Sequence, residues 1–195
     1  MARTASIERN TTETRIKIEL ELDGNGESNI STGIGFFDHM LTHLAKHGLL
    51  NLSVDCVGDL EVDSHHTVED VGIAIGKCIS KAVGDKAGMV RYGSSVVPMD
   101  EALVMTALDI SGRGSLFYGL ELSKEMVGSF DSELTSEFFK SVCANAGINC
   151  HIRQLDGGNA HHIIEAAFKS FARALRTAVS IDPKIQGIPS TKGTL

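Results

Sequence analysis

A short pattern of two adjacent histidines followed by a glutamate occurs twice in this 195-residue chain: His65-His66-Thr-Val-Glu69 and His161-His162-Ile-Ile-Glu165. Apolar residues follow each copy at steps of three and four, which predicts an amphipathic helix. They fall at matching places, namely Val68, Val71, Ile75, Ile79 and Val83 in one copy and Ile164, Ala167, Phe171, Leu175 and Val179 in the other. Chance similarity of two helices would not reproduce the histidines, the glutamate and the apolar register together. The chain is therefore expected to contain two related halves.

The segments around each copy also correspond. A short alternating stretch, which predicts a strand, precedes each copy near residues 52–56 and 148–152. Before it comes a helical stretch that ends at a glycine, about 36–47 and 133–146, and each half opens with further alternating strands. Each half thus reads strand–strand–helix–strand–helix. This order predicts an α+β fold with two sheets, each covered by helices on one side. We expect a single domain of two halves, about 5–88 and 89–182, followed by an irregular docked tail.

Composition excludes several classes of protein. The net charge of −7 argues against a nucleic-acid partner, although a small anion needs only a few local cations. No run of 18 apolar residues occurs, so no membrane span is expected, and the amino terminus lacks an apolar signal core. The four cysteines form no C-x-x-C pair and read as reduced, buried thiols. A cytoplasmic protein is expected.

The repeated pattern has the residue types of a metal site. On a helix, His65 and Glu69 lie on one face, whereas His66 points about 100° away. One helix can therefore offer two groups to one ion and one group to another. Two facing helices, with the addition of His39, predict one ion bound by His39, His66, His161 and Glu165. The second ion would have His65, Glu69 and His162, and its fourth ligand stays open.

Other interpretations apply to single residues. Glu69 and Glu165 could simply favour a helix amino terminus, but that would not explain the histidines beside them. Isolated histidines such as His43 and His151 are interpreted as surface or satisfied core residues. Imidazole and carboxylate ligands without thiolate suit manganese, iron, zinc or nickel. Several histidines with one carboxylate, and room left for a substrate, favour an octahedral ion, and we expect manganese.

The sequence resembles the imidazoleglycerol-phosphate dehydratase family. The resemblance rests on stretches in order along nearly the whole chain, among them Arg9-Asn-Thr-Thr-Glu13-Thr, Gly35-Phe-Phe-Asp38-His39, Asp63-Ser-His65-His66, Pro98-Met-Asp100-Glu101, Asp109-Ile-Ser-Gly-Arg113, Asn159-Ala-His161-His162 and Pro189-Ser190-Thr191-Lys192-Gly193. It implies a duplicated fold like the second domain of ribosomal protein S5. It also implies two manganese ions per active site and a homo-oligomer of 24 subunits with sites between subunits.

The implied reaction removes water from imidazoleglycerol phosphate and gives imidazole acetol phosphate. The proton that is lost sits on a carbon with no adjacent carbonyl, so the imidazole ring must take up the electrons. Two cations at the ring nitrogens would stabilise that charge. The resemblance places Glu13 at the substrate. Because no histidine is close to it in the sequence, we expect Glu13 to act in acid–base chemistry, together with the metal-linked Glu69 and Glu165.

The resemblance also implies a set of substrate-binding residues beside Glu13: His47, Arg91, Arg113, Lys169, Ser190, Thr191 and Lys192. Arginine and lysine side chains suit a phosphate. Two positions depart from the family. Glu137 stands where members often have a metal-binding histidine, so it is the candidate fourth ligand of the second ion, and His43 stands where many members have glutamine. Two alternatives remain, a two-metal phosphoesterase and a non-catalytic metal-binding shell protein. Cleavage of phosphate esters, or metal retention without turnover, would distinguish them.

Overall fold

The computed structural model describes residues 2–123 and 125–195. The first half contains β1 (Thr4–Asn10), β2 (Thr14–Glu21), β3 (Ser28–Ser31), α1 (Gly35–Gly48), β4 (Asn51–Gly58) and α2 (His65–Val83). The second half contains β5 (Tyr92–Met99), β6 (Ala102–Asp109), β7 (Ser115–Gly119), α3 (Leu134–Ala146), β10 (Asn149–Asp156) and α4 (Ala160–Val179). A small hairpin of β8 (Met126–Val127) and β9 (Phe130–Asp131) is inserted between β7 and α3. Apart from this hairpin, the two halves have the same order of elements.

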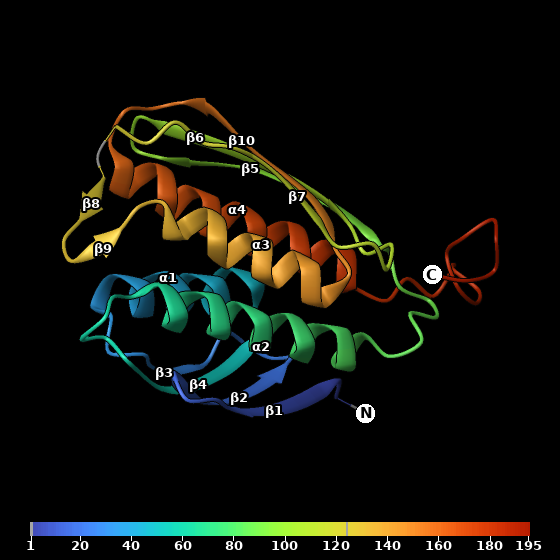
Figure 1. Ribbon diagram of the computed structural model, residues 1–195. Coiled ribbons are helices and arrows are strands. Elements are labelled where there is room, and N and C mark those ends of the chain that lie inside the picture. Colours follow the sequence, from blue (N-terminus) through green and yellow to red (C-terminus); the bar gives the residue numbers. More distant parts are fainter. Residues whose placement is uncertain (1, 124) are drawn as a thin grey trace.

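Each half forms a four-stranded sheet, and the two sheets have matching strand orders, β1-β2-β4-β3 and β5-β6-β10-β7. The four helices lie between the sheets, which makes four layers in the order sheet, helices, helices, sheet (Figure 1). The α+β class predicted from the sequence is confirmed. The predicted element order was incomplete, because β3 and β7 precede the first helix of their halves. Each of these short strands pairs in parallel with the strand that follows the helix, so its partner is distant in the sequence.

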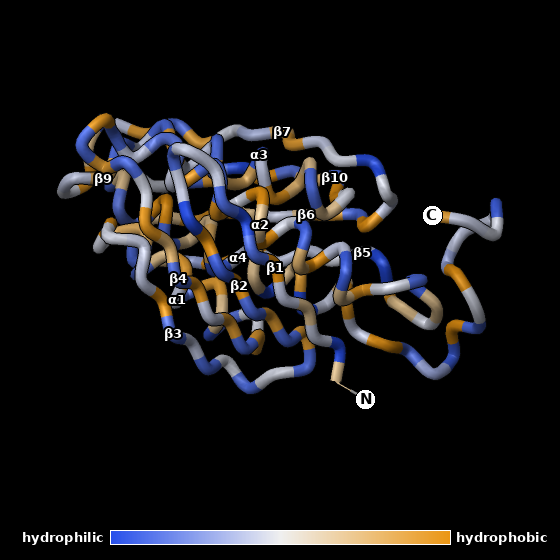
Figure 2. Tube along the Cα trace, turned by 60° about the horizontal axis from the view of Figure 1, so that its bottom comes forward, coloured by the Kyte–Doolittle hydropathy of each residue, from blue (hydrophilic) through white to orange (hydrophobic). Residues whose placement is uncertain are grey.

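The alternation of apolar and polar residues along the strands decides which face of each sheet is buried. In β2, Ile16, Ile18 and Leu20 are buried against the helices, whereas the residues between them are exposed. Hydrophobic and hydrophilic residues alternate in the same way along the strands in Figure 2. The apolar stripes of the helices close the core, which includes the fully buried side chains of Phe37, Phe138, Phe168 and Phe171.

The two halves meet through their helices. Helix α1 packs on α4 and α2 packs on α3. Gly72 and Gly76 lie one turn apart on α2, and a Cβ atom at Gly76 would lie 2.7 Å from the carbonyl oxygen of Val142 on α3. Small residues at these positions therefore allow a close approach of α2 to α3. This close packing against α3 determines the position of the end of α2 that carries the histidines.

The tail, residues 181–195, is irregular and extends from one end of the molecule, beside the segment that joins the two halves (Figure 1). Ile181 forms a β-bridge with Met89, and the amide of Gly88 donates a hydrogen bond to the carbonyl of Gly187. Among the described residues, no helix has the length and apolar character that crossing a membrane requires.

Candidate active site

Glu165 is the centre of the most compact group of candidate ligands. The side chain of Asn159 accepts a hydrogen bond from the amide of His161 and caps α4, so the second histidine pair lies in the first turn of that helix. Glu165 follows one turn later, and its side chain is only 6% exposed. Its Oε2 atom lies 3.3 Å from Nε2 of His161 and 3.4 Å from Nε2 of His39, which α1 contributes. Three of the four ligands predicted for the first ion therefore meet within one chain.

Glu165 is ionised in this environment. Burial by itself would raise the pKa of its carboxyl group, but Lys169, His43 and His161 outweigh burial and hold the pKa at about 2. The Nζ atom of Lys169 lies 2.6 Å from Oε1, so Oε2 is the oxygen that faces His39 and His161. A buried, ionised carboxylate beside several imidazoles is a donor set that fits a divalent transition metal.

His66 and His162, the second histidine of each pair, have carboxylate partners of their own. The Nδ1 atom of His66 lies 3.0 Å from Asp59, and Nδ1 of His162 lies 2.7 Å from Glu101. These hydrogen bonds raise the pKa of both imidazoles. A carboxylate on Nδ1 fixes the ring and leaves Nε2 directed outward, which is the usual arrangement behind a metal-binding histidine.

The Nε2 atoms of these two histidines have corresponding neighbours. Nε2 of His66 lies 3.7 Å from Glu13, and Nε2 of His162 lies 3.7 Å from Asp100. Glu13 lies in the β1–β2 connection and Asp100 in the β5–β6 connection, which are equivalent places in the two halves. Although no histidine is close to Glu13 in the sequence, folding brings His66 next to it.

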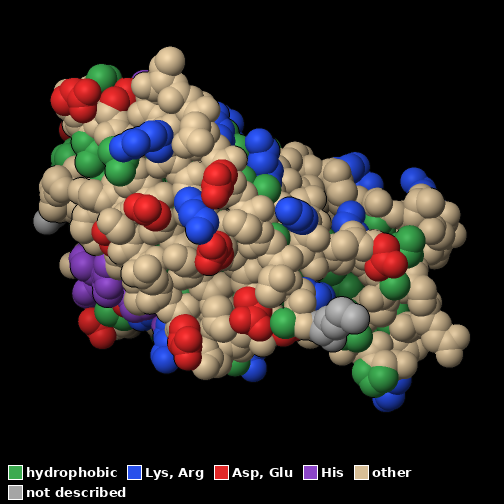
Figure 3. All heavy atoms as spheres, turned by 90° about the horizontal axis from the view of Figure 1, so that it is seen from below, with side chains coloured by type: hydrophobic (Ala, Val, Ile, Leu, Met, Phe, Trp, Pro, Cys, Tyr) green, Lys and Arg blue, Asp and Glu red, His purple; other side chains and the backbone are tan. Residues whose placement is uncertain are grey.

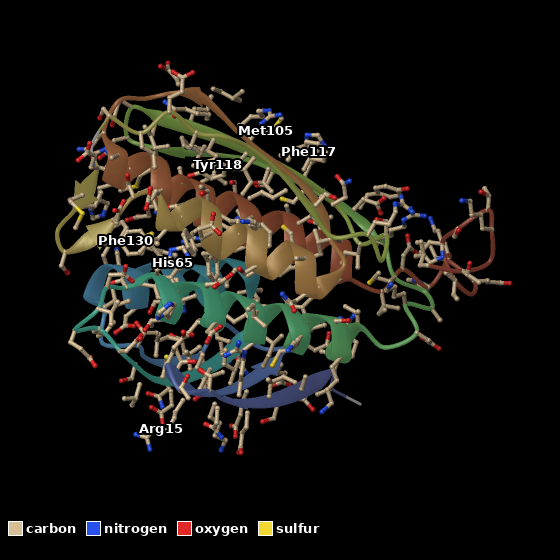
Figure 4. All side chains as sticks on the ribbon, in the orientation of Figure 1. Arg15, His65, Met105, Phe117, Tyr118 and Phe130 are labelled. Atoms are coloured by element: carbon tan, nitrogen blue, oxygen red, sulfur yellow. The ribbon has the colours of Figure 1, made fainter. Side chains whose placement is uncertain are left out.

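The ligands predicted for the second ion are less closely grouped. His65 lines a pocket of about 440 Å³ with residues that include Asp63, Asp131 and Glu133. Figure 4 shows it at the helix end near Phe130. Glu69 is half-buried one turn along α2. Glu137, on the neighbouring α3, is half-buried and lies 3.1 Å from Nζ of Lys140. In the described part of the chain, the one group of three ligand atoms within 4.8 Å of one another is His39, His43 and Glu165.

Neither predicted ligand set is complete within one chain. Among the described contacts, His66 has Asp59 and Glu13 as partners rather than Glu165, and His162 has Glu101 and Asp100. The first set therefore lacks His66. In the second set His162 lies apart, and none of the described contacts joins His65, Glu69 and Glu137. Histidine side chains gather at one end of the molecule in Figure 3, opposite the end from which the tail extends.

Five of the predicted phosphate-binding residues line one pocket of about 760 Å³ near the tail: Arg91, Arg113, Ser190, Thr191 and Lys192. Arg91 is held in place by two bonds to Asp109, at 2.7 Å and 3.1 Å, and by a bond of 2.8 Å to the carbonyl of Pro189. The tail is thus bonded to Arg91, which directly precedes β5. Arg113 and Lys192 are exposed and offer their charges to the pocket.

The other predicted substrate residues lie elsewhere. Lys169 contacts Glu165, and the ring of His47 stacks on His43 with centroids 5.5 Å apart. The amide of Arg91 donates to the carbonyl of Ala178, near the far end of α4 from Glu165. At 1.5 Å per residue, this part of the helix is about 20 Å long. The pocket of Arg91 and the group around Glu165 are therefore too far apart in one chain for one small substrate.

Sequence reasoning missed several partners of the candidate residues. Asp59, Asp100 and Glu101 orient or adjoin the second histidines, and Asp109 holds Arg91. Asp100, Glu101 and Asp109 had a signal, since they lie in stretches shared with the family, whereas Asp59 had none. His43 had one too, because it follows His39 by one helical turn.

Comparisons with known proteins identify the family of the chain. The sequence model of the family described as imidazoleglycerol-phosphate dehydratase matches residues 32–175. An imidazoleglycerol-phosphate dehydratase from Moorella thermoacetica is 57% identical over 195 residues and covers 100% of both chains. One from Desulforamulus reducens is 56% identical and covers 99% of this chain and 98% of its own.

Solved structures give the same answer for the fold. The crystal structure of the Staphylococcus aureus imidazoleglycerol-phosphate dehydratase has a TM-score of 0.84 and 42% identity, and covers 92% of this chain and 99% of its own. That of the Pyrococcus furiosus protein, solved in complex with (S)-C348, has a TM-score of 0.84 and 34% identity, with 97% and 100% covered. The chain belongs to the imidazoleglycerol-phosphate dehydratase family, whose members are hydro-lyases that remove water from imidazoleglycerol phosphate in histidine biosynthesis.

Proposed function

We propose that the chain dehydrates imidazoleglycerol phosphate with the imidazole ring held between two metal ions, and that these ions are manganese. The observation that carries the proposal is the division of each histidine pair. In α4, His161 faces Glu165 of its own helix. In both helices the second histidine binds a carboxylate through Nδ1, Asp59 for His66 and Glu101 for His162, and so turns Nε2 away from it. Each pair can therefore serve two different ions.

His39, His161 and Glu165 would hold one ion, with His66 of another chain. His65, Glu69 and Glu137 would hold the other, again with His162 of another chain. Bound at the ring nitrogens, divalent cations supply the charge that stabilises electrons moving into the ring when the proton is lost. The donors fit manganese because they are imidazoles and carboxylates without thiolate. In the described residues, all four cysteines are buried and free, which supports a cytoplasmic location.

Glu13 is the proposed acid–base group, with Glu69 and Glu165 as metal-linked carboxylates. Its side chain is 49% exposed and lies 3.7 Å from Nε2 of His66. A carboxylate at the edge of a proposed metal site, not itself buried among cations, can hold or release a proton next to the substrate. The phosphate would bind in the pocket of Arg91, Arg113 and Lys192, with Lys169 and His47 reaching the substrate from a different chain.

The distribution of these residues favours a homo-oligomer, which we propose to contain 24 subunits. A substrate with three carbons between its ring and its phosphate cannot reach from Glu165 to the Arg91 pocket of one chain, about 20 Å along α4. Residues of several chains would have to form each site. The resemblance to the family supplies the number of subunits.

The outer faces of the two sheets support such an assembly. Apart from Val57, the outward residues of the first sheet are charged or polar, as with Arg15, Lys17 and Glu19, whereas those of the second include Val96, Met105 and Phe117. Val96 is 52% exposed and Phe117 is 45% exposed. Figure 4 shows Met105 and Phe117 outside the second sheet and Arg15 outside the first. An apolar outer face of this kind fits a second copy of the chain.

Two measurements test the assembly. Met105→Asp should reduce the particle mass in light scattering, whereas Lys17→Asp, the matched change outside the first sheet, should not. Equal masses for both variants would exclude the second sheet as a contact. Because bridging ions would stabilise the particle, chelation should also lower its mass. An unchanged mass after complete removal of metal would refute that coupling.

Activity tests the function itself. Purified, manganese-loaded protein should convert imidazoleglycerol phosphate to an enolisable ketone without release of inorganic phosphate. Release of phosphate would instead favour the phosphoesterase alternative, and bound metal without turnover would favour a storage protein. Co-assembled His39→Ala and His66→Ala chains should recover activity, since about a quarter of the sites would then have both histidines in a mixed symmetric particle. No recovery would refute ligands from different chains.

A further inference from the structure

His43 lies one turn after His39 on α1 and points into the group around Glu165. Its Nε2 atom is 3.2 Å from Nε2 of His39 and 3.4 Å from Oε1 of Glu165. The side chain is 18% exposed.

The distances between these atoms suit a shared cation. An ion held at about 2.1 Å by nitrogen and oxygen keeps neighbouring ligand atoms about 3.0 Å apart in an octahedron and about 3.4 Å apart in a tetrahedron. The separations of His39 from His43, of His39 from Glu165 and of His161 from Glu165 are 3.2, 3.4 and 3.3 Å. The neighbouring cation, Lys169, is bonded to Oε1 of Glu165, so Oε2 remains for an ion.

We propose that His43 is an additional ligand of the metal ion bound by His39, His161 and Glu165. The proposal rests on the metal site proposed above. One chain then offers His39, His43 and Glu165, whose ligand atoms lie within 4.8 Å of one another, and His161 lies 3.3 Å from the same glutamate. The equivalent helix in the other half, α3, has no histidine at all and contributes only Glu137. The two metal positions are therefore unequal, and the one at His43 binds its ion more tightly.

Titration of the metal-free, full-length protein with Co²⁺ tests this inequality, with the visible absorption of the bound ion as the readout. His43→Gln keeps a polar side chain of similar length. It should weaken the tighter Co²⁺ site by about tenfold or more, since even partners of metal ligands contribute that much, and should leave the weaker site unchanged. His151→Gln is the matched control, because His151 lies on the outer face of the second sheet, stacked on Phe117 at 4.4 Å.

His39→Gln separates the two possible failures. If it leaves both Co²⁺ sites intact, the proposed metal site itself is wrong. If it removes the tighter site while His43→Gln behaves as wild type, His43 is only a hydrogen-bond partner of His39, and the present inference is overturned.

A measurement on wild-type protein covers the case in which His43→Gln does not fold. Electron paramagnetic resonance of one equivalent of bound Cu²⁺ reports the nitrogens around it. We expect one imidazole more than the three that His39, His161 and His66 supply. A count of three would overturn the assignment.

Discussion

The Nδ1 atom of His66 lies 3.0 Å from Oδ2 of Asp59, which leaves Nε2 as the ring nitrogen that faces Glu13. His162 repeats this relationship in the other half, with Glu101 on Nδ1 at 2.7 Å and Asp100 near Nε2. The carboxylates come from different elements in the two halves, since Asp59 follows β4 and Glu101 lies between β5 and β6. The two halves therefore orient the second histidine in the same way, but with carboxylates from different elements.

Asp59→Asn should lower the affinity for one metal ion by about 10- to 100-fold, as is typical when the partner of a ligating histidine is changed. The carboxylate of Asp59 raises the pKa of the His66 imidazole and so makes Nε2 a stronger donor to a metal ion. The amide of asparagine lacks this negative charge. Metal content at limiting manganese gives the measurement. Asp55→Asn, on the outer face of the first sheet, is the control, and equal metal affinity in the two variants would contradict the role of Asp59.

Much of this site follows from the sequence, because its main determinant is a local pattern. The placement of His161 and Glu165 on one helical face depends only on their spacing, and the structure has them 3.3 Å apart. The partners of the second histidines could not be predicted in the same way. Asp59 and Glu101 reach His66 and His162 only after strands and connections have folded against the helices. The short parallel strands β3 and β7 were missed for a similar reason, since their partners are β4 and β10, beyond a helix.

Gly76→Ala should destabilise the protein by about 1–3 kcal/mol, the usual cost of forcing an extra methyl group into a packed interface. The new Cβ atom would lie 2.7 Å from the carbonyl oxygen of Val142 and 2.8 Å from Cβ of Asn145, so α2 and α3 would have to separate. Urea unfolding at fixed protein and metal concentration gives the comparison. Gly35→Ala is the control, because a Cβ atom there meets nothing within 4 Å. Equal unfolding midpoints would mean that the interface is loosely packed.

Glu137→Ala should weaken one metal site more than the other, and Glu137→His should preserve binding. Glu137 is the one carboxylate of α3, which packs against α2 and its Glu69. A histidine would give the same ion a nitrogen in place of an oxygen. Titration with manganese measures both sites. Lys140→Ala removes the cation 3.1 Å from Glu137 without removing a donor and serves as the control. Metal content indistinguishable from wild type in both Glu137 variants would make Glu137 only a helix surface residue.

Glu13→Gln should keep metal and assembly but lower turnover by roughly 10²-fold or more, a typical size for acid–base assistance. Glutamine keeps the shape of the side chain and removes the group that can take up a proton. The contact of 3.7 Å to Nε2 of His66 makes the distinction from a metal ligand essential, because a glutamate in that position could also bind the ion. Metal content must therefore be measured on the same sample as turnover, and the acidic limb of the rate profile should change as well.

Glu8→Gln is the matched control for this last prediction, since Glu8 is an exposed carboxylate on β1 that pairs in register with Lys17, on the outer face of the first sheet. It should leave metal, particle mass and turnover unchanged. Loss of metal in Glu13→Gln would mean that Glu13 holds an ion. Near-normal turnover with an unchanged rate profile would move proton transfer to another group, with Glu69 and Glu165 as the first residues to change, because they are the remaining carboxylates proposed at the two ions.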